Sequence, residues 1–378
     1  MKTADVVRAL DSIADPALAG SWDNVGLLVG DPEAAADGAI LLAIDFSEAV
    51  YEEACEVSAR TLVCYHPPIF SGMKRFVAHD ARSRALLACA RSGIAVYSPH
   101  TALDAVAGGV ADWLLDATIG DAAEHNGARR AIEPQTSLDG NQTHKLVTFV
   151  PSSVLDDVRH ALARAGAGVI GDYTHCTFAS EGTGAFLGGD STNPTVGKAG
   201  RLEHAPEIRL ETVCPARALP AVIAALYDSH PYEEPAFDVF KREAVVRAGE
   251  GAGRVTDLEG PVSLDQIAQN LKRVLGVPTL RLSKAPGAER VSRVGVCPGS
   301  GGSLLDGAGL GEGGLFVTGE MKHHELLGAR DRGISVLLAG HTHTERGYLP
   351  RYADMIRQHL PSVDVRVSAA DVAPWVEV

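Results

Sequence analysis

Short apolar segments that alternate with helical patterns limit the folds open to this chain more than any other feature of its sequence. A predicted helix at 3–13 comes first. It is followed by a strand at 39–44, a helix at 47–60, a strand at 61–65, a helix at 80–92 and a strand at 94–97. The same alternation resumes at about residue 254, with helices at 263–275 and 320–331 and strands at 279–283, 291–297, 315–318, 334–338 and 363–368. Strands that alternate with helices predict an α/β layer structure with mainly parallel strands.

A different pattern interrupts this alternation in the middle of the chain. Residues 117–143 are polar and predict a linker, and residues 249–253, which are rich in glycine, predict a second one. Between them the predicted elements are a strand at 146–150, a helix at 152–165, two strands across 168–187, a strand at 208–213, a helix at 218–229 and a strand at 236–240. This order resembles a ferredoxin-like split βαβ unit with an extra strand or hairpin.

We therefore expect one α/β domain that is interrupted by an inserted α+β domain. Residues 1–125 and 254–378 would form the first and second parts of the α/β domain, and residues 145–245 the insert. A chain of 378 residues is long enough for two or three such domains, each with its own core.

Charge and composition exclude several classes of function. The chain has 34 basic and 48 acidic residues, so its formal net charge is −14, which disfavours nucleic acid as a partner. No apolar run is long enough to span a bilayer, and the charged start of the chain does not resemble a signal peptide, so we expect a cytoplasmic protein that does not bind membranes. The six cysteines are scattered without a CxxC pair and are interpreted as reduced core thiols.

Candidate metal ligands follow three of the predicted strands. His66 follows the strand at 61–65, His100 and Asp104 follow the strand at 94–97, and His341 and Glu345 follow the strand at 334–338. In a parallel sheet these three ends would open at one edge, where α/β proteins place their sites, and His, Asp and Glu suit a divalent ion. The alternatives are that His341 and Glu345 form a solvated helix face and that His66 only caps its strand. His100 would then be a core histidine and Asp104 a helix N-cap.

Other polar segments give weaker signals. Residues 299–303 resemble an anion-binding nest at a helix start but are more typical of a plain turn. Residues 320–325 are a solvated helix start or a second group of ligands. The histidine-containing segment 230–235 predicts a structured turn or an interface. The basic residues near the proposed site, which could bind a polyanion or could be ordinary surface charges, are Lys74, Arg75, Lys322 and Arg346.

Five motifs in a fixed order resemble the Nif-three-like family over residues 5–370. The motifs are Trp22-Asp-Asn-Val-Gly26, Tyr65-His-Pro-Pro-Ile-Phe70, Ser98-Pro-His-Thr-Ala-Leu-Asp104, Thr318-Gly-Glu-Met-Lys-His-His324 and His341-x-x-x-Glu-Arg-Gly-Tyr-Leu349. Bacterial members of that family are often labelled GTP cyclohydrolase 1 type 2 homologs. The resemblance implies a dinuclear metal centre and a homohexamer built as a trimer of dimers. Residues 230–238 are similar to a motif of the longer members, whose insert resembles PII-like or CutA-like modules.

The resemblance also assigns roles to individual residues. His66 and Asp104 would bind one metal, His341 would bind the other, and Glu345 would bridge both. Tyr65 stands where many bacterial members have a second histidine, and a neutral phenol is a poor ligand unless the metal deprotonates it. The second site would then be weak, or be completed by His100 or water. Two divalent ions per subunit are expected, with zinc first and manganese, iron or magnesium as alternatives.

Two functions follow from the resemblance. The first is a metal-dependent hydrolase of the GTP cyclohydrolase type, in which metal-activated water opens the imidazole ring of a purine nucleotide or a related small molecule. His100 or His343 would then move protons. The second is a non-catalytic, metal-binding hexameric scaffold or regulatory protein, with a ligand-binding PII-like insert.

Overall fold

The computed structural model describes residues 1–120, 128–138 and 140–375, and it divides into two compact units. The first unit comprises residues 1–135 and 247–378, and the second comprises residues 136–246. The chain leaves the first unit through β5 (Glu133–Ser137) and returns through β10 (Val245–Ala252), and these two strands form a two-stranded sheet. Among the described helices, none combines the length and the apolar character that crossing a membrane requires.

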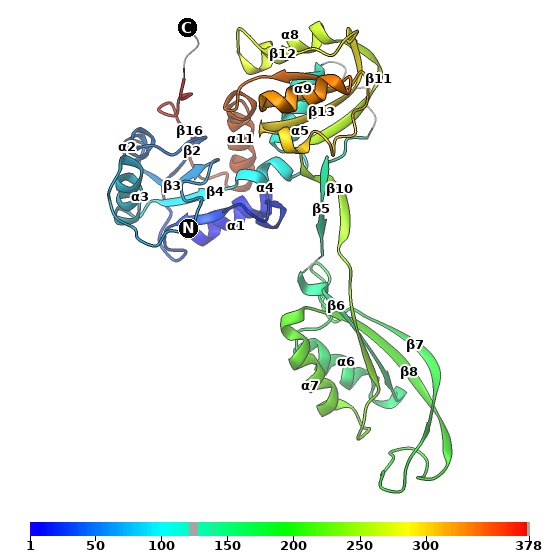
Figure 1. The fold of residues 1–378 in the computed structure, drawn as a ribbon. Coiled ribbons are helices and arrows are strands. Elements are labelled where there is room, and N and C mark those ends of the chain that lie inside the picture. Colours follow the sequence, from blue (N-terminus) through cyan, green and yellow to red (C-terminus); the bar gives the residue numbers. More distant parts are fainter. Residues whose placement is uncertain (121–127, 139, 376–378) are drawn as a thin grey trace. The chain divides into compact units, whose positions relative to one another are not determined.

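The first unit contains two five-stranded sheets, each covered by helices (Figure 1). In spatial order the first sheet consists of β1 (Gly26–Val29), β4 (Ala95–Ser98), β3 (Ala59–Cys64), β2 (Ala39–Ala43) and β16 (Val365–Val367). All its neighbouring strands are parallel except β1, which runs antiparallel to β4. Every residue of β2 is buried, as expected for a central strand with helices on both faces.

Alternate residues of β2 point into two different cores. Ile40 and Leu42 pack with α1 (Thr3–Ile13) and α11 (Leu349–His359). Leu41 and Ala43 pack with α2 (Glu48–Glu56) and α3 (Ala81–Ser92) on the opposite face.

The second sheet consists, in spatial order, of β11 (Arg254–Ser263), β13 (Arg290–Ser300), β14 (Leu315–Glu320), β15 (Ser335–Leu338) and β12 (Arg281–Ser283). Its central strands β13, β14 and β15 are parallel, and the outer strands β11 and β12 are antiparallel to their neighbours. One core contains side chains from α5 (Val110–Ile119) and α8 (Leu264–Leu275), and another contains Ala329 of α9 (His323–Asp331).

Arg254, at the start of β11, joins segments that are far apart in the sequence. It is 1% exposed, and its guanidinium group donates to the Asp112 carboxylate and to the backbone oxygens of Gly251, Gly253, Ala105 and Val106 at distances of 2.7–3.1 Å. Ala105 is the last residue of the short helix α4 (His100–Ala105), so Arg254 fixes the end of the helix on which His100 and Asp104 lie.

The second unit has the element order β-α-β-β-α-β. These elements are β6 (His144–Val150), α6 (Leu155–Arg164), β7 (Thr177–Leu187), β8 (Leu202–Cys214), α7 (Leu219–Ser229) and β9 (Phe237–Lys241). The strands form one antiparallel sheet in the order β7-β8-β6-β9. The two helices share one apolar core with the sheet, to which Val158 and Leu226 contribute from the helices and Leu146 and Leu210 from the strands.

Short 3-10 helices also occur among the described residues. They are η1 (Pro16–Leu18), η3 (Gly140–Gln142), η4 (Ser152–Val154), η5 (Ala216–Ala218) and η6 (Gly302–Leu304).

Several expectations from the sequence were wrong. The predicted linker 117–143 contains the end of α5 and all of β5 among its described residues, and residues 249–252 of the predicted return linker belong to β10. The two strands expected across 168–187 are the single strand β7, which pairs with β8 along its whole length because β8 is much longer than predicted. The helix α11 and the strand β11 were not predicted.

The three strand ends with candidate ligands do not open at one sheet edge, which corrects the expectation of a single sheet. β3 and β4 belong to the first sheet, and β15 belongs to the second. The candidate ligands therefore come from two sheets of the first unit.

Candidate metal centre

His66 lies just beyond the end of β3, where backbone pairing with the neighbouring segment continues for two more residues. The backbone N–H groups of Tyr65 and His66 donate to Ala43 and Ile44 at 2.8 and 3.0 Å, and Pro67, which has no N–H group, follows. His66 Nδ1 lies 3.0 Å from Asp45 Oδ1, at the end of the adjacent strand. Its other nitrogen, Nε2, is thereby left to face the second sheet.

His341 and Glu345 follow β15 in a similar way. Gly340 donates to the Gly319 oxygen at 2.9 Å and has a φ of +86°, a left-handed conformation in which a side chain would be strained. The helix α10 (His343–Arg346) begins after this turn, so Glu345 lies in the helix and His341 in the turn before it. His341 Nδ1 lies 3.0 Å from Glu320 Oε1, and its Nε2 lies 3.2 Å from Glu345 Oε1.

The three side chains form one group in which Glu345 lies between two imidazoles. The candidate ligand atoms of His66, His341 and Glu345 all lie within 4.8 Å of one another. Glu345 is 3% exposed, and its Oε2 atom, 3.5 Å from His66 Nε2, is buried and accepts no hydrogen bond from the described residues. A buried carboxylate oxygen without a hydrogen bond is costly, and a metal cation bound beside it would offset that cost.

The surroundings of this group also fit a divalent ion. Imidazole nitrogen and carboxylate oxygen suit zinc and other first-row metals. The Nδ1 atom of each histidine contacts a carboxylate, that of Asp45 for His66 and that of Glu320 for His341. Metal-binding histidines usually form such a hydrogen bond through the ring nitrogen that does not bind the metal. The backbone of Gly299 also lies close to the Glu345 carboxylate, because a Cβ atom on Gly299 would lie 2.7 Å from Glu345 Oε1. The residues present therefore fit a metal ion.

Opposite charges at this centre shift the pKa values of its members. Burial alone would lower the pKa of His66, but Asp45 and Glu345 raise it to about 10. Glu345 raises the pKa of His341 to about 9 despite burial. Burial opposes ionisation of Glu345, yet its contacts with His341 and His66 lower its pKa overall. Both imidazoles are therefore protonated near neutral pH when no metal is bound.

Metal binding is consequently expected to strengthen as the pH rises. A metal-binding histidine must be neutral, so binding must displace protons whose pKa values are about 10 and about 9. With two protons displaced, affinity should increase up to about 100-fold per pH unit below both pKa values. Competition with a chelator at about pH 6 and about pH 8, using manganese, measures this change. An affinity that is independent of pH would contradict the assignment of the two histidines.

Tyr65 and Asp104 are hydrogen-bonded to each other. The buried Tyr65 hydroxyl donates to Asp104 Oδ1 at 2.6 Å, and burial together with the nearby carboxylates raises the pKa of Tyr65 well above its usual value. Burial also raises the pKa of Asp104 to about 6. Asp104 lies inside α4 near its carboxyl end, so the alternative that it is a helix N-cap is wrong. Asp104 does not belong to the group of His66, His341 and Glu345.

Removing the Tyr65 hydroxyl should make a second metal bind more tightly. In Tyr65→Phe, both Asp104 oxygens become available at little change in volume. A hydrogen bond to a carboxylate is worth about 1.5–3 kcal/mol, so the affinity for a second ion should rise by roughly 10-fold or more. Zinc titration with elemental analysis measures both equivalents. Unchanged binding of the second equivalent would show that Asp104 is not a ligand.

His100 is held in an unusual backbone conformation beside the centre. Its φ is +29°, its Nδ1 lies 2.7 Å from Asp23 Oδ1, and Asp23 also accepts from the Thr101 hydroxyl at 2.5 Å. The His100 ring centroid lies 5.5 Å from that of His66. Strained backbone of this kind is typical of functional positions. Asp23, which belongs to the Trp22-Asp-Asn motif, thus orients a ring beside the proposed ligands.

The remaining candidates are placed differently. His343 Nδ1 lies 3.1 Å from the Ala339 oxygen, and its side chain lines a cavity of about 390 Å³ together with His341, Arg281 and Trp375. Arg346 forms an ion pair with Asp371 at 2.6 Å, so its charge is already compensated. Residues 299–303 end a strand and enter η6, which is only three residues long, so no long helix begins there.

Sequence reasoning gave no role to Asp45 or Asp23 and counted Glu320 only within a possible second group of ligands. In the structure these three carboxylates hold the rings of His66, His100 and His341. A signal for two of them existed. Asp45 and Glu320 stand at the ends of β2 and β14, which neighbour β3 and β15. Each histidine is thus supported by the carboxylate at the end of the adjacent strand.

Comparison with known proteins gives a consistent result over the whole chain. The family model described as Duf34/NIF3 (NGG1p interacting factor 3) matches residues 1–374. A GTP cyclohydrolase 1 type 2 homolog of Mycobacterium tuberculosis is 34% identical over 381 residues, which cover 99% of this chain and 97% of that protein. NIF3-like protein 1 of Rattus norvegicus is 31% identical, with coverage of 98% and 91%. The crystal structure of a Bacillus cereus protein related to NIF3 has a TM-score of 0.71 and 29% identity, with coverage of 100% and 99%.

Proposed function

Because the chain belongs to the Duf34/NIF3 (NGG1p interacting factor 3) family, we propose that it is a metal-dependent hydrolase acting on a purine nucleotide or a related small molecule. The observation that carries this proposal is the buried Glu345 carboxylate, which lies between His66 and His341 with one oxygen that accepts no hydrogen bond from the described residues. The name of the curated relatives, GTP cyclohydrolase 1 type 2 homolog, supports purine nucleotides as the first substrates to test.

His66, His341 and Glu345 would hold the first metal ion in this proposal, and Asp104 would contribute to a second one. When bound, a divalent ion acts as a Lewis acid and lowers the pKa of a water molecule, which supplies a nucleophile near neutral pH. Asp45 and Glu320 keep the two imidazoles oriented through their Nδ1 atoms.

His100 is the best-placed residue to move protons. Because Asp23 holds Nδ1 of His100, the opposite nitrogen of the ring is left for the substrate. The ring lies next to His66, so a group that reacts at the metal centre would be within reach of it. His343 would be a second proton carrier, from the cavity that it shares with His341.

Exposed aromatic rings beside the centre support a substrate with an aromatic heterocycle. Trp22 and Phe70 are 64% and 51% exposed, and their ring centroids lie 6.0 Å apart. Both rings also lie near His100, at 6.1 and 6.4 Å. Large exposed aromatic side chains of this kind can stack against a flat base, which every purine offers.

Replacing Trp22 with alanine should therefore weaken substrate binding without removing the metal. Stacking of one base on an aromatic side chain is worth about 1–3 kcal/mol, so KM should rise roughly 5- to 100-fold while kcat changes little. Trp22→Phe, which keeps an aromatic ring, should show a smaller rise. A large fall in kcat at unchanged KM would mean that Trp22 does not act by binding the substrate.

Hydrolysis itself is tested with the untagged protein, purified without chelators and loaded with zinc or manganese. Opening of the imidazole ring of GTP changes its ultraviolet spectrum, and loss of formate can be measured enzymatically. Turnover that depends on the metal would support the proposal. Retention of the metal with no turnover of any purine nucleotide would favour the non-catalytic, metal-binding alternative instead.

The proposal also includes the expected homohexamer and the cytoplasmic location. Native mass spectrometry of the full chain would count the subunits and the bound ions in the same experiment. A monomer at micromolar concentration would contradict the expected assembly but would leave the metal centre unaffected.

A further inference from the structure

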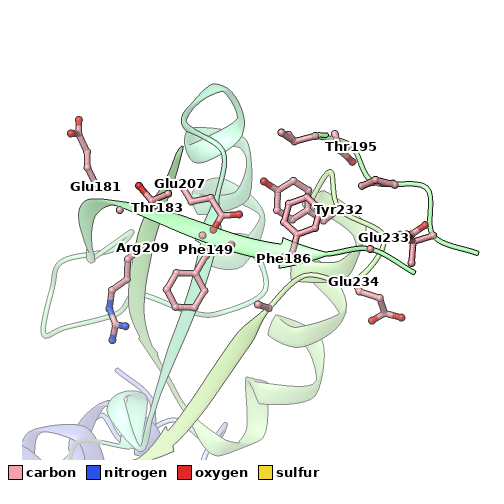
Figure 2. A pocket seen from close by; sticks show the side chains of 18 of the residues that line it. Phe149, Glu181, Thr183, Phe186, Thr195, Glu207, Arg209, Tyr232, Glu233 and Glu234 are labelled. Atoms are coloured by element: carbon pink, nitrogen blue, oxygen red, sulfur yellow. The ribbon is translucent and has the colours of Figure 1, made fainter. Parts of the chain in front are cut away.

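The second unit contains a cavity of about 570 Å³ that the proposed hydrolase does not use (Figure 2). Strands β6, β7 and β8, the loop between β7 and β8 and the turn before β9 line it. Its volume falls in the range of small-molecule sites.

The turn that forms one wall is fixed by a buried histidine. His230 is 7% exposed, and its Nδ1 atom accepts the backbone N–H of Tyr232 at 3.1 Å. Its Nε2 atom lies 2.9 Å from the Phe149 oxygen, so that nitrogen carries the proton and donates it. Burial lowers the pKa of His230, which keeps the ring neutral. The segment 230–235, noted in the sequence, is therefore a structured turn in which His230 fixes the position of Tyr232.

The loop at the end of the β7–β8 hairpin is attached to the same turn. The Thr195 hydroxyl donates to the Pro231 oxygen at 2.8 Å, and the Asn193 backbone N–H donates to Glu233 Oε1 at 3.2 Å. These bonds hold two walls of the cavity together before any ligand arrives. A largely preformed site loses less entropy on binding.

The charge that lines the cavity is predominantly negative. The acidic residues are Glu181, Glu207, Glu233 and Glu234. Arg209 also lines it, but its Nε atom donates to Glu211 at 2.8 Å and its guanidinium group lies over the Phe149 ring, 5.8 Å from the centroid. Glu211 also pairs with Lys145, but the four lining carboxylates outnumber the one guanidinium group, so an anion such as a nucleotide would be repelled.

Aromatic rings also line the cavity. Phe149, Phe186 and Tyr232 line the cavity together with Glu207 (Figure 2). The Tyr232 hydroxyl is buried and makes no hydrogen bond with the described residues. Burial, with the nearby Glu207 carboxylate, raises the pKa of Tyr232 to about 12, so the phenol stays neutral and can donate. Rings beside a carboxylate favour a cation with an apolar body.

We propose that this cavity binds a small organic cation, an ammonium or guanidinium group on an apolar body, with Glu207 as the counter-charge. The aromatic rings receive the apolar body and contribute cation–π attraction. The site lies wholly within the second unit, so it is independent of the metal centre and of the proposed hydrolase activity.

Three probes with one body and different charges test this proposal on the full-length protein. Phenethylamine is the cation, phenethyl alcohol the neutral analogue and phenylacetate the anion. Calorimetric titration should give an affinity for phenethylamine at least about 10-fold above that for either analogue. Absence of phenethylamine binding, or equal binding of the three probes, would overturn the proposal.

Matched variants locate the binding. Glu207→Gln should weaken phenethylamine binding by roughly 10-fold and leave phenethyl alcohol unaffected. Glu203→Gln, on the same strand but outside the lining, should change neither. If both glutamine variants behaved like the original protein, Glu207 would not be the counter-charge and the proposal would fail.

A pair of glycines on β7 provides a second test that keeps the charge. A Cβ atom on Gly184 would lie 2.1 Å from Glu207 Oε2, so Gly184→Ala must displace that carboxylate. On Gly182 the nearest atom would be 3.9 Å away, so Gly182→Ala is the tolerated control. Gly184→Ala alone should weaken phenethylamine binding, with unfolding monitored for both variants. Equal effects of the two substitutions would contradict the placement of the ligand beside Glu207.

Discussion

Glu345→Gln is expected to lose at least about 100-fold in metal affinity, and the proposed metal-dependent hydrolysis with it. Removing a residue that only hydrogen-bonds to a metal ligand typically lowers the metal affinity by about 10- to 100-fold. Glu345 is placed to contact the ion directly, so its loss should cost more. Glutamine has nearly the same shape but no charge, so it cannot compensate a cation in this buried position.

The fold should survive this substitution. In the absence of metal, the Glu345 carboxylate helps to keep His66 and His341 protonated, because it raises the pKa values of both. Without it the imidazoles can release their protons, so no uncompensated charge needs to stay buried. Elemental analysis of the purified variant, together with a thermal unfolding curve, separates loss of metal from loss of structure.

Glu320→Gln is the control variant, for which a smaller loss of metal affinity is expected. Glu320 contacts the same histidine through Nδ1, but its side chain is 54% exposed, and it lies outside the group of candidate ligands. Its replacement should weaken metal binding by about 10- to 100-fold and leave some metal bound. A Glu345→Gln protein that retained its full metal content would remove the basis of the proposed hydrolase.

Arg254→Met is expected to destabilise the first unit by about 3–5 kcal/mol, the range for breaking a buried ion pair. The substitution leaves the Asp112 carboxylate without its buried partner and removes a donor from four backbone oxygens. Unfolding should occur on the order of 10 °C lower, given the size of this unit. The end of α4 would lose its attachment to β11, so the position of His100 should also become less defined.

Tryptophan fluorescence can follow this unit selectively. All three tryptophans, Trp22, Trp113 and Trp375, lie in the first unit, so their signal does not report on the second. The control is Arg332→Met, which removes an exposed ion pair with Asp306 and should change stability by less than about 1 kcal/mol. Equal stability of the two variants would mean that the bonds of Arg254 contribute little to the fold.

Much of the local structure could be predicted because burial leaves a periodic pattern. The prediction of a helix at 3–13 is confirmed, with Val6, Leu10 and Ile13 buried on one face. The strand at 39–44 was predicted from a continuous apolar run, which fits a strand with helices on both sides. The missed helix α11 carried a signal as well, since Leu349, Tyr352 and Ile356 recur at helical spacing.

The arrangement of strands could not be predicted in the same way. An apolar run shows that a strand is buried but not which strand lies beside it, so two five-stranded sheets were taken for one. The extent of β8 was hidden because the half of it from Leu202 to Glu207 is largely polar or exposed and contains Pro206. Its pairing with β7 depends on the partner strand and not on its own sequence pattern.

The candidate site likewise could be predicted only in part. The residue types after the strands indicated His66, His341 and Glu345, which the structure brings together. Asp45, Glu320 and the bond between Tyr65 and Asp104 depend on which strands are neighbours, and this information is spread over the whole chain.

The first unit is discontinuous in sequence, and this affects how the centre can assemble during synthesis. His66 is made before the insert, whereas His341 and Glu345 follow it by about a hundred residues. The insert is a separate compact unit, and such units generally fold in the order in which they leave the ribosome. The nascent chain therefore has a folded insert while it still lacks two of the three ligands. A fragment that ends anywhere before β15 cannot form the complete centre, so an ion bound by all three side chains would enter a protein that is nearly finished.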